Sequence, residues 1–187
     1  NNDLLKKIDD GLINFIKNKK VIFTLSGLIK RKGIDDLLQA SKILLSERDD
    51  FVLLIGGRGP EKNALNSQIS NDKIFNSKLI GFLSDEEVLF WMKNCDFFAI
   101  PSYSEGNPTT MFEALGFGKP VISTRVGGVP EIITDDCGLL MDNNPIDISN
   151  KLRSALDKKW DYDKIRRYSE NFTWENIAKQ INDFYRD

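Results

Sequence analysis

The stretch DFFAIPSYSEGNPTTMFEALGFGKPVIST, residues 96–124, decides the fold of this chain of 187 residues. Its apolar run at 96–100 predicts a buried strand, and a second apolar run at 120–124 predicts another. Between them a helix is expected to start near Pro108, because Asn107 is a preferred cap residue and proline suits the first helical position. A strand, a helix and a second strand in this order are typical of a parallel sheet.

The same alternation continues on both sides of this stretch. Further strands are predicted at 21–25, 51–55, 78–82 and 138–141, and helices at 34–45, at 61–69, from Ser84, from Asn144 and from Thr173. A leading helix is expected within 1–18. We therefore predict a single α/β domain over 1–187, a doubly wound parallel sheet of about six strands with helices on both faces. Ligands of such folds lie at the carboxyl ends of the strands.

Composition excludes several classes of function. The chain has 26 Lys and Arg against 28 Asp and Glu, and this net charge of -2 argues against a nucleic-acid partner. No apolar run reaches about 18 residues, so no transmembrane helix is expected, and no secretory signal is present at the start. The chain has no histidine, which excludes a histidine-based triad and most zinc sites, and we expect no metal site. Cys95 and Cys137 are predicted to be free thiols in a reducing compartment.

The start of the helix near Pro108 is a candidate anion site. The first backbone amides of a helix lack partners within it, so the amides of Thr109, Thr110 and Met111 are predicted to point outward. Gly106 has no side chain and lets a ligand approach the backbone. Since this loop follows the strand at 96–100, it lies at the edge of the sheet where ligands bind.

Two glutamates flank this helix start. Glu105 lies in the loop before the helix and Glu113 lies within it, where its side chain leans back toward the helix start. The apolar neighbours of Glu113 predict a partly buried carboxylate, which needs donors such as the vicinal hydroxyls of a sugar. The alternative is that both acids merely favour the helix dipole.

The segment 101–120 resembles the signature of retaining glycosyltransferases of family 4, which have the GT-B fold. The resemblance rests on Pro101-Ser102, Glu105-Gly106, Glu113-Ala114-Leu115 and Gly118-Lys119-Pro120-Val121. It extends over about 20–187 through the first loop at 26–33, the Gly-x-Gly-Pro turn at 57–60, the loop near the base at 81–83, the Gly-Gly-x-x-Glu element at 127–131 and Trp174.

This resemblance implies a Rossmann-like C-terminal half that binds a nucleotide diphosphate sugar, with a UDP-sugar as the favoured donor. The sugar would pass, with retention, to a hydroxyl of a glycan, lipid-linked or small-molecule acceptor, without a cofactor or metal. The acceptor-binding half would lie outside this chain, which fits its abrupt start at Asn1, and the helix at 173–187 would pack toward that half. The chain alone is expected to be inactive, and the full-length protein to be cytoplasmic or peripheral at the inner membrane face.

The resemblance also assigns roles to individual residues. Glu113 would hold the ribose, Glu105 the donor sugar, and Lys32 the diphosphate as it leaves. The backbone near Phe82 and Leu83 would meet the base. The segment that would contact the sugar and phosphates comprises Gly106, Asn107, Pro108, Thr109, Thr110 and Met111.

One position departs from the family pattern. Gly27 stands where the first loop of the family usually carries an arginine, and Lys30 or Arg31 could take over its contact with phosphate. Two alternatives to a transferase are a sugar-nucleotide epimerase of the same fold and a non-catalytic module that binds nucleotide sugars. The missing histidines argue against the epimerase, and the two glutamates argue against a module that has lost its ligand.

Overall fold

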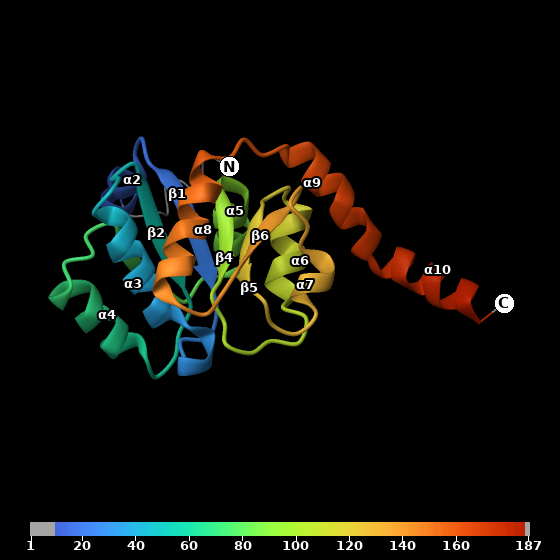
Figure 1. The fold of residues 1–187 in the computed structure, drawn as a ribbon, viewed down its shortest axis with the longest axis horizontal. Helices are drawn as coiled ribbons and strands as arrows, with labels where there is room; N and C mark the ends of the chain where they lie inside the picture. The colour runs from blue at the N-terminus through green and yellow to red at the C-terminus, as the bar shows by residue number, and fades with distance from the viewer. Residues whose placement is uncertain (1–9, 186–187) are drawn as a thin grey trace.

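The computed structural model describes residues 10–185 and contains a six-stranded parallel sheet with the order β3-β2-β1-β4-β5-β6 (Figure 1). The strands are β1 (Lys20–Leu25), β2 (Phe51–Gly56), β3 (Ser77–Gly81), β4 (Phe97–Ile100), β5 (Val121–Thr124) and β6 (Gly138–Met141). The predicted doubly wound sheet of about six strands is therefore confirmed. The strand order reverses between β1 and β4, so the loops after these two strands turn to opposite faces and leave a crevice.

Helices cover both faces of the sheet because neighbouring residues of each strand point to opposite faces. On β1, Ile22 packs in the core beneath α3 (Ile34–Leu45) and α8 (Pro145–Asp157), with α4 (Lys62–Asn71) beside them. Val21 and Phe23 pack in the second core, beneath α5 (Asp85–Asn94) and α6 (Thr109–Gly116). The ring of Phe23 meets that of Phe98 edge-on, with centroids 5.6 Å apart, which ties β1 to β4 at the switch point.

Local capping chemistry sets several helix starts. Ser84 accepts a hydrogen bond from the amide of Glu87, whose carboxylate accepts one from the amide of Ser84, as the sequence predicts for α5. Asn144 caps α8, and Thr173 caps α10 (Trp174–Phe184). Of the leading helix expected within 1–18, the structure describes α2 (Asp10–Ile16), and residues 1–9 lie outside the described part.

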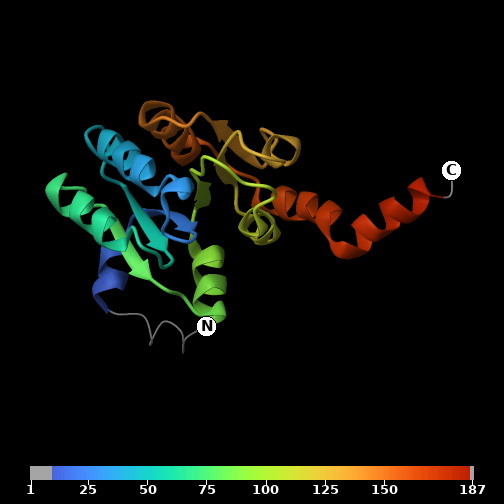
Figure 2. The same ribbon diagram turned by 90° about the horizontal axis from the view of Figure 1, so that it is seen from below.

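The short helix α7 (Val129–Ile132) was not predicted from the sequence. The helix α9 (Tyr162–Ser169) lies in the part after 138–141 that the sequence predicts to be helical, and Asp161 caps its start. From α9 the chain runs through a 3-10 turn, Glu170–Phe172, into α10, which extends away from the body of the molecule (Figures 1 and 2). The ring of Phe172 packs against Phe112 of α6 and Tyr168 of α9, with centroids 5.5 and 5.2 Å apart. The start of α10, which we call the arm, is therefore held against α6, the helix that begins at the crevice.

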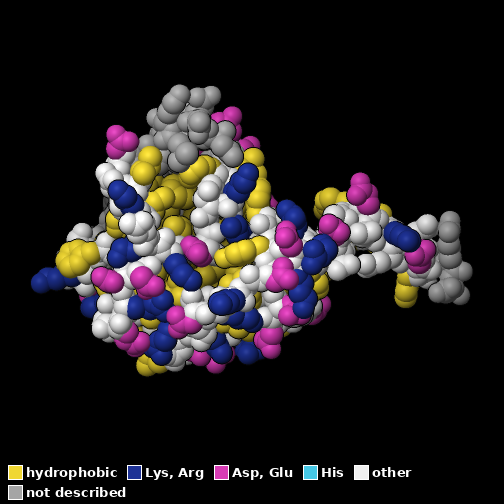
Figure 3. Space-filling model, turned by 90° about the horizontal axis from the view of Figure 1, so that it is seen from above, with side chains coloured by type: hydrophobic (Ala, Val, Ile, Leu, Met, Phe, Trp, Pro, Cys, Tyr) yellow, Lys and Arg dark blue, Asp and Glu magenta, His cyan; other side chains and the backbone are white. Residues whose placement is uncertain are grey.

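The arm itself buries none of its side chains. Trp174, Phe184 and Tyr185 are 86%, 79% and 81% exposed. Figure 3, which views the molecule from above, shows apolar side chains on this arm and others gathered in a hollow on the main body. Within residues 10–185, no helix combines the length and the apolar character that crossing a lipid bilayer requires.

Candidate functional site

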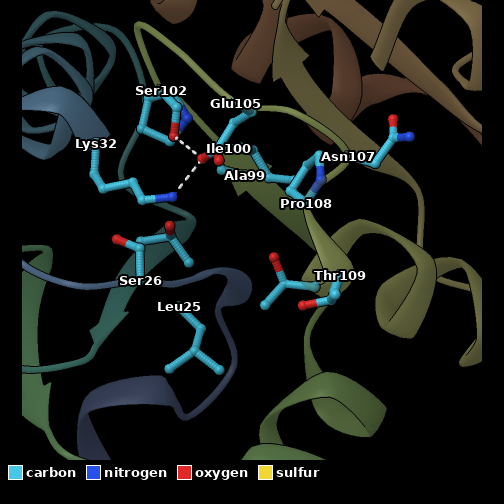
Figure 4. Close-up of a pocket in the computed structure, with 13 residues that line it drawn as sticks. Leu25, Ser26, Lys32, Ala99, Ile100, Ser102, Glu105, Asn107, Pro108 and Thr109 are labelled. Atoms are coloured by element: carbon cyan, nitrogen blue, oxygen red, sulfur yellow. Dashed lines mark hydrogen bonds and ion pairs between the residues drawn. The ribbon is translucent and has the colours of Figure 1, made fainter. Parts of the chain in front are cut away.

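A cavity of about 300 Å³ opens at the carboxyl ends of β1 and β4, where the strand order reverses (Figure 4). Its lining comes from the end of β1, the 3-10 turn Lys30–Lys32, the end of β4 and the start of α6. The residues that line it are Thr24, Leu25, Ser26, Lys32, Ala99, Ile100, Pro101, Ser102, Glu105, Asn107, Pro108, Thr109 and Thr110. The cavity thus joins the first loop and the loop before α6.

Lys32 and Glu105, which both line this cavity, form an ion pair. The ammonium of Lys32 lies 2.6 Å from Oε1 of Glu105, and the side chains are 18% and 10% exposed. The hydroxyl of Ser102 donates to the same oxygen over 2.6 Å (Figure 4). Nη1 of Arg31 lies 3.9 Å from the other oxygen, Oε2. Lys32 is the one cation and Glu105 the one anion among the residues lining the cavity. The two residues predicted to face different parts of a ligand are therefore paired with each other here.

Hydrogen bonds join the loop that carries Glu105 to the loop that carries Lys32. The amide of Tyr103 donates to the carbonyl of Arg31 over 2.9 Å, and the guanidinium of Arg31 donates to the carbonyl of Ser104 over 2.6 Å. The hydroxyl of Tyr103 donates to Asp36 of α3 over 2.5 Å, and this hydrogen bond raises the pKa of Tyr103 to about 12. The two loops therefore form one unit that holds Lys32 against Glu105.

Two glycines allow these loops to come close. Gly33 has a φ of +62°, and a Cβ there would overlap the carbonyl oxygen of Pro101. On the other side of the loop, Gly127 has a φ of +53°, and a Cβ there would overlap the carbonyl oxygens of Glu105 and Gly106. The amide of Gly128 donates to the carbonyl of Gly106 over 3.0 Å. Any larger residue at Gly33 or Gly127 would displace the loop that positions Glu105.

Ser102 is itself held by β5 and by the loop after β6. Its carbonyl oxygen accepts hydrogen bonds from the hydroxyl of Thr124, 2.5 Å away, and from the side-chain amide of Asn143, 3.3 Å away. Thr124 and Asn143 were missed by the sequence analysis. No local motif marks them, because their contact with Ser102 depends on β4, β5 and β6 following one another in that order across the folded sheet.

The start of α6 differs from the prediction by one residue. The helix begins at Thr109 with Pro108 in the capping position, and Pro108 has an extended ψ of 119°. Asn107 makes no capping bond, and its side chain points away from the ion pair (Figure 4). The amide of Met111 donates to the carbonyl of Pro108 over 3.0 Å, so the expectation that this amide is free is wrong.

The amides of Thr109 and Thr110 are the free donors at this helix start. Neither has an acceptor among residues 10–185, and both residues line the cavity. They face the same space as Lys32, which adds a full positive charge to the partial charge of the helix end. The site therefore has the chemistry to hold an anionic group such as a phosphate.

Glu113 is exposed, and the expectation of a partly buried carboxylate is wrong. Met111, Ala114 and Leu115 are fully buried on one face of α6, and Glu113 lies on the opposite face. Within the described part of the chain the carboxylate has no hydrogen bond or ion pair, and Glu113 does not line the cavity. It is thus a free acceptor beside the cavity, available to a ligand that extends over the helix.

The other predicted site residues lie outside the cavity lining, namely Gly27, Arg31, Phe82, Leu83, Gly106 and Met111. A Cβ at Gly27 would meet nothing within 4 Å. The glycine that stands in place of the usual arginine therefore leaves open space at this position. Phe82 is 67% exposed with the guanidinium of Arg58 4.8 Å from its ring centroid, whereas Leu83 is buried. The exposed Phe82 ring can stack with a flat ligand group.

The described residues hold no cluster of three or more Cys, Asp or Glu side chains that could coordinate a metal ion. Both cysteines are free, as expected, and the structure buries both of them. Burial raises the pKa of the Cys95 thiol to about 12, so this thiol is a poor nucleophile at neutral pH.

The model of the family called glycosyl transferases group 1 matches residues 7–187. An uncharacterized glycosyltransferase of Methanocaldococcus jannaschii is 30% identical over 165 residues, which cover 85% of this chain and 46% of that protein. A GDP-mannose-dependent monoacylated alpha-(1-6)-phosphatidylinositol monomannoside mannosyltransferase of Corynebacterium glutamicum is 32% identical, covering 83% of this chain and 41% of that protein. The chain therefore spans less than half the length of these relatives.

Two solved structures share the fold at lower identity. The apo form of the lipopolysaccharide outer core galactosyltransferase WaaB superposes with a TM-score of 0.78 at 23% identity, over 89% of this chain and 48% of that one. The pneumococcal O-GlcNAc transferase GtfA, solved with UDP and GlcNAc, gives a TM-score of 0.73 at 22% identity, over 90% of this chain and 36% of that one.

Proposed function

This chain belongs to the glycosyl transferases group 1 family, and we propose that it is the donor-binding C-terminal domain of a retaining glycosyltransferase. The complete enzyme would transfer a hexose from a nucleoside diphosphate sugar to an acceptor hydroxyl in polysaccharide or glycolipid synthesis. A relative's name specifies GDP-mannose and a neighbouring structure contains UDP, so both bases are candidates, and we favour UDP.

One observation carries this proposal: Lys32 and the two free amides of Thr109 and Thr110 line one cavity at the switch point of the sheet. A helix end contributes about 0.3–1 kcal/mol per anionic contact, and a charge-assisted hydrogen bond from lysine contributes more. A diphosphate is the group that can engage all three donors together. We infer that it lies across the start of α6 with Lys32 beside it.

The remaining contacts follow from this placement. Glu105 would accept hydrogen bonds from the donor sugar within the cavity, and Glu113 would accept the two ribose hydroxyls outside it. The base would reach the exposed ring of Phe82. Gly27 and Gly106 leave the backbone open to the ligand, since a Cβ at either position meets nothing within 4 Å.

The chemistry that these groups support is departure of the diphosphate from the anomeric carbon. Negative charge builds on the departing phosphate in the transition state, where Lys32 and the end of α6 would stabilise it. Glu105 would hold the sugar hydroxyls while positive charge develops on the ring. We propose that these groups stabilise the leaving diphosphate without a metal ion.

The acceptor would be bound outside this chain, in the part of the longer enzyme that the relatives imply. The exposed apolar side chains of α10 would pack against that part, so the 187-residue chain alone should bind donor and transfer no sugar. A glycan or lipid-linked acceptor would suit a cytoplasmic enzyme that is peripheral to the inner membrane face.

Isothermal titration calorimetry with UDP, GDP and ADP tests the proposal on the 187-residue chain. At least one diphosphate should bind, and Lys32→Met should weaken that binding by about tenfold, because a charge-assisted contact is lost. Lys179→Met, on the exposed arm, is the matched control and should leave the affinity unchanged. Binding of none of the three diphosphates, or equal affinity in Lys32→Met, would contradict the proposal.

A further inference from the structure

Lys32 and Glu105 form a close ion pair with each other in this structure. Both Lys32 and Ser102 donate to the same oxygen, Oε1 of Glu105, over 2.6 Å each. With one cation and one anion among them, the residues that line the cavity carry no net charge. A phosphate that binds Lys32 must therefore compete with Glu105 for it.

This competition has a cost because the side chain of Glu105 is only 10% exposed, so its carboxylate cannot recover full hydration. Withdrawing the cation from such a carboxylate leaves a desolvated negative charge. A ligand that has a phosphate but no neighbouring hydroxyl would bind Lys32 and would give Glu105 no new hydrogen-bond donor. A ligand that offers phosphate and a neighbouring hydroxyl supplies new partners to both side chains.

We propose that Lys32 and Glu105 exchange their contact with each other for contacts with the donor when it binds. This exchange would favour binding of the intact nucleotide sugar over the free nucleoside diphosphate. On binding the donor, Lys32 moves from Oε1 of Glu105 to the diphosphate, and a sugar hydroxyl donates to the oxygen that Lys32 leaves. The diphosphate product has no sugar hydroxyl to offer Glu105. Glu105 therefore competes with the diphosphate for Lys32, and the binding of the diphosphate is weakened. This inference rests on the proposed function and adds to it the basis of donor selection and product release.

Ser102 is the positioning residue that makes the exchange possible. It is 2% exposed, and its carbonyl is fixed by Thr124 and Asn143, so its hydroxyl remains aimed at Glu105 when Lys32 moves. Arg31 adds a second positive charge 3.9 Å from the other carboxylate oxygen. Glu105 therefore stays in place, with one hydrogen bond, to receive the sugar.

The test compares two affinities in three proteins: the wild type, Glu105→Gln and Ser102→Ala. The ligands are UDP with UDP-glucose and GDP with GDP-mannose, and the measured quantity is the Kd of the diphosphate divided by the Kd of the intact donor. In Glu105→Gln the neutral amide holds Lys32 less strongly and gives the sugar a weaker acceptor. The ratio should fall by about tenfold, mainly through tighter binding of the free diphosphate.

In Ser102→Ala the ratio should rise, because Glu105 then loses its last hydrogen bond when a diphosphate alone removes Lys32. Glu131→Gln, at an exposed glutamate of the short helix α7, is the control and should leave the ratio unchanged. Circular dichroism melts check that each variant folds; if Glu105→Gln does not fold, Ser102→Ala decides alone.

The outcomes separate this inference from the proposed function. Suppose that the wild type binds and that neither Glu105→Gln nor Ser102→Ala changes the ratio by more than about twofold, which is less than the loss of one hydrogen bond predicts. This result would overturn the exchange of partners and leave the proposal of donor binding intact. Failure of the wild type to bind either diphosphate overturns the proposed function and the exchange together. Opposite shifts of the ratio in the two variants support the exchange.

Discussion

Replacing Glu113 with alanine should separate ligand binding from stability. The side chain is exposed and has no partner among the described residues, and alanine is a good helix former. The free energy of unfolding should therefore change by no more than about 0.5 kcal/mol. In the bound state, the same carboxylate would accept two ribose hydroxyls. One charge-assisted hydrogen bond contributes about 1.5–3 kcal/mol, so losing both should lower the affinity by at least about tenfold.

Calorimetry can assign this loss to the ribose. The affinity of Glu113→Ala for a nucleoside diphosphate should fall, whereas its affinity for inorganic pyrophosphate, which has no ribose, should equal that of the wild type. Glu131→Ala provides a matched control, since Glu131 is an exposed glutamate on the neighbouring helix α7. Unchanged affinity for every diphosphate, or an equal loss with pyrophosphate, would refute the ribose role of Glu113.

Three further predictions concern the loops and the metal. Gly33→Ala should destabilise the fold by more than about 1 kcal/mol in denaturant titrations, because of its positive φ and the overlap with Pro101; a neutral result would contradict the close approach of the two loops. Stability should fall between about pH 10 and 12, since folded Tyr103 keeps its proton while the unfolded chain releases it, and Tyr103→Phe should remove this part of the pH dependence. EDTA should leave the affinity for a diphosphate unchanged, and a loss would reveal a metal ion in donor binding.

The parts of the fold that local chemistry decides could be predicted from the sequence. The strands are short apolar runs between turns, and the reciprocal bonds of Ser84 and Glu87 depend only on residues three apart. The cavity between the loops after β1 and β4 also follows from the order of the elements, because the switch point of a doubly wound sheet lies there.

The errors in the site come from neighbours that are distant in the sequence. Asn107 is of a residue type that often caps helices. However, the amide of Gly128 holds the carbonyl of Gly106 in the same loop, and the helix begins one residue later than expected. The support of Ser102 by Thr124 and Asn143 likewise depends on the packing of three strands.

The exposure of Glu113, in contrast, could have been predicted from the sequence. At 3.6 residues per turn, Met111, Ala114 and Leu115 share one face of α6 and Glu113 lies on the other. Apolar neighbours along the chain therefore indicated a buried helix face, and did not indicate that every side chain between them is buried.

The most direct test of the account is an amide-resolved NMR titration of the 187-residue chain with a nucleoside diphosphate. We predict that the largest shift changes fall on the amides of Thr109 and Thr110 and on the loop around Lys32, and that Met111, whose amide is already bonded to Pro108, shifts less. Shift changes confined to another part of the sheet, or none at saturating diphosphate, would contradict the placement of the donor at the start of α6.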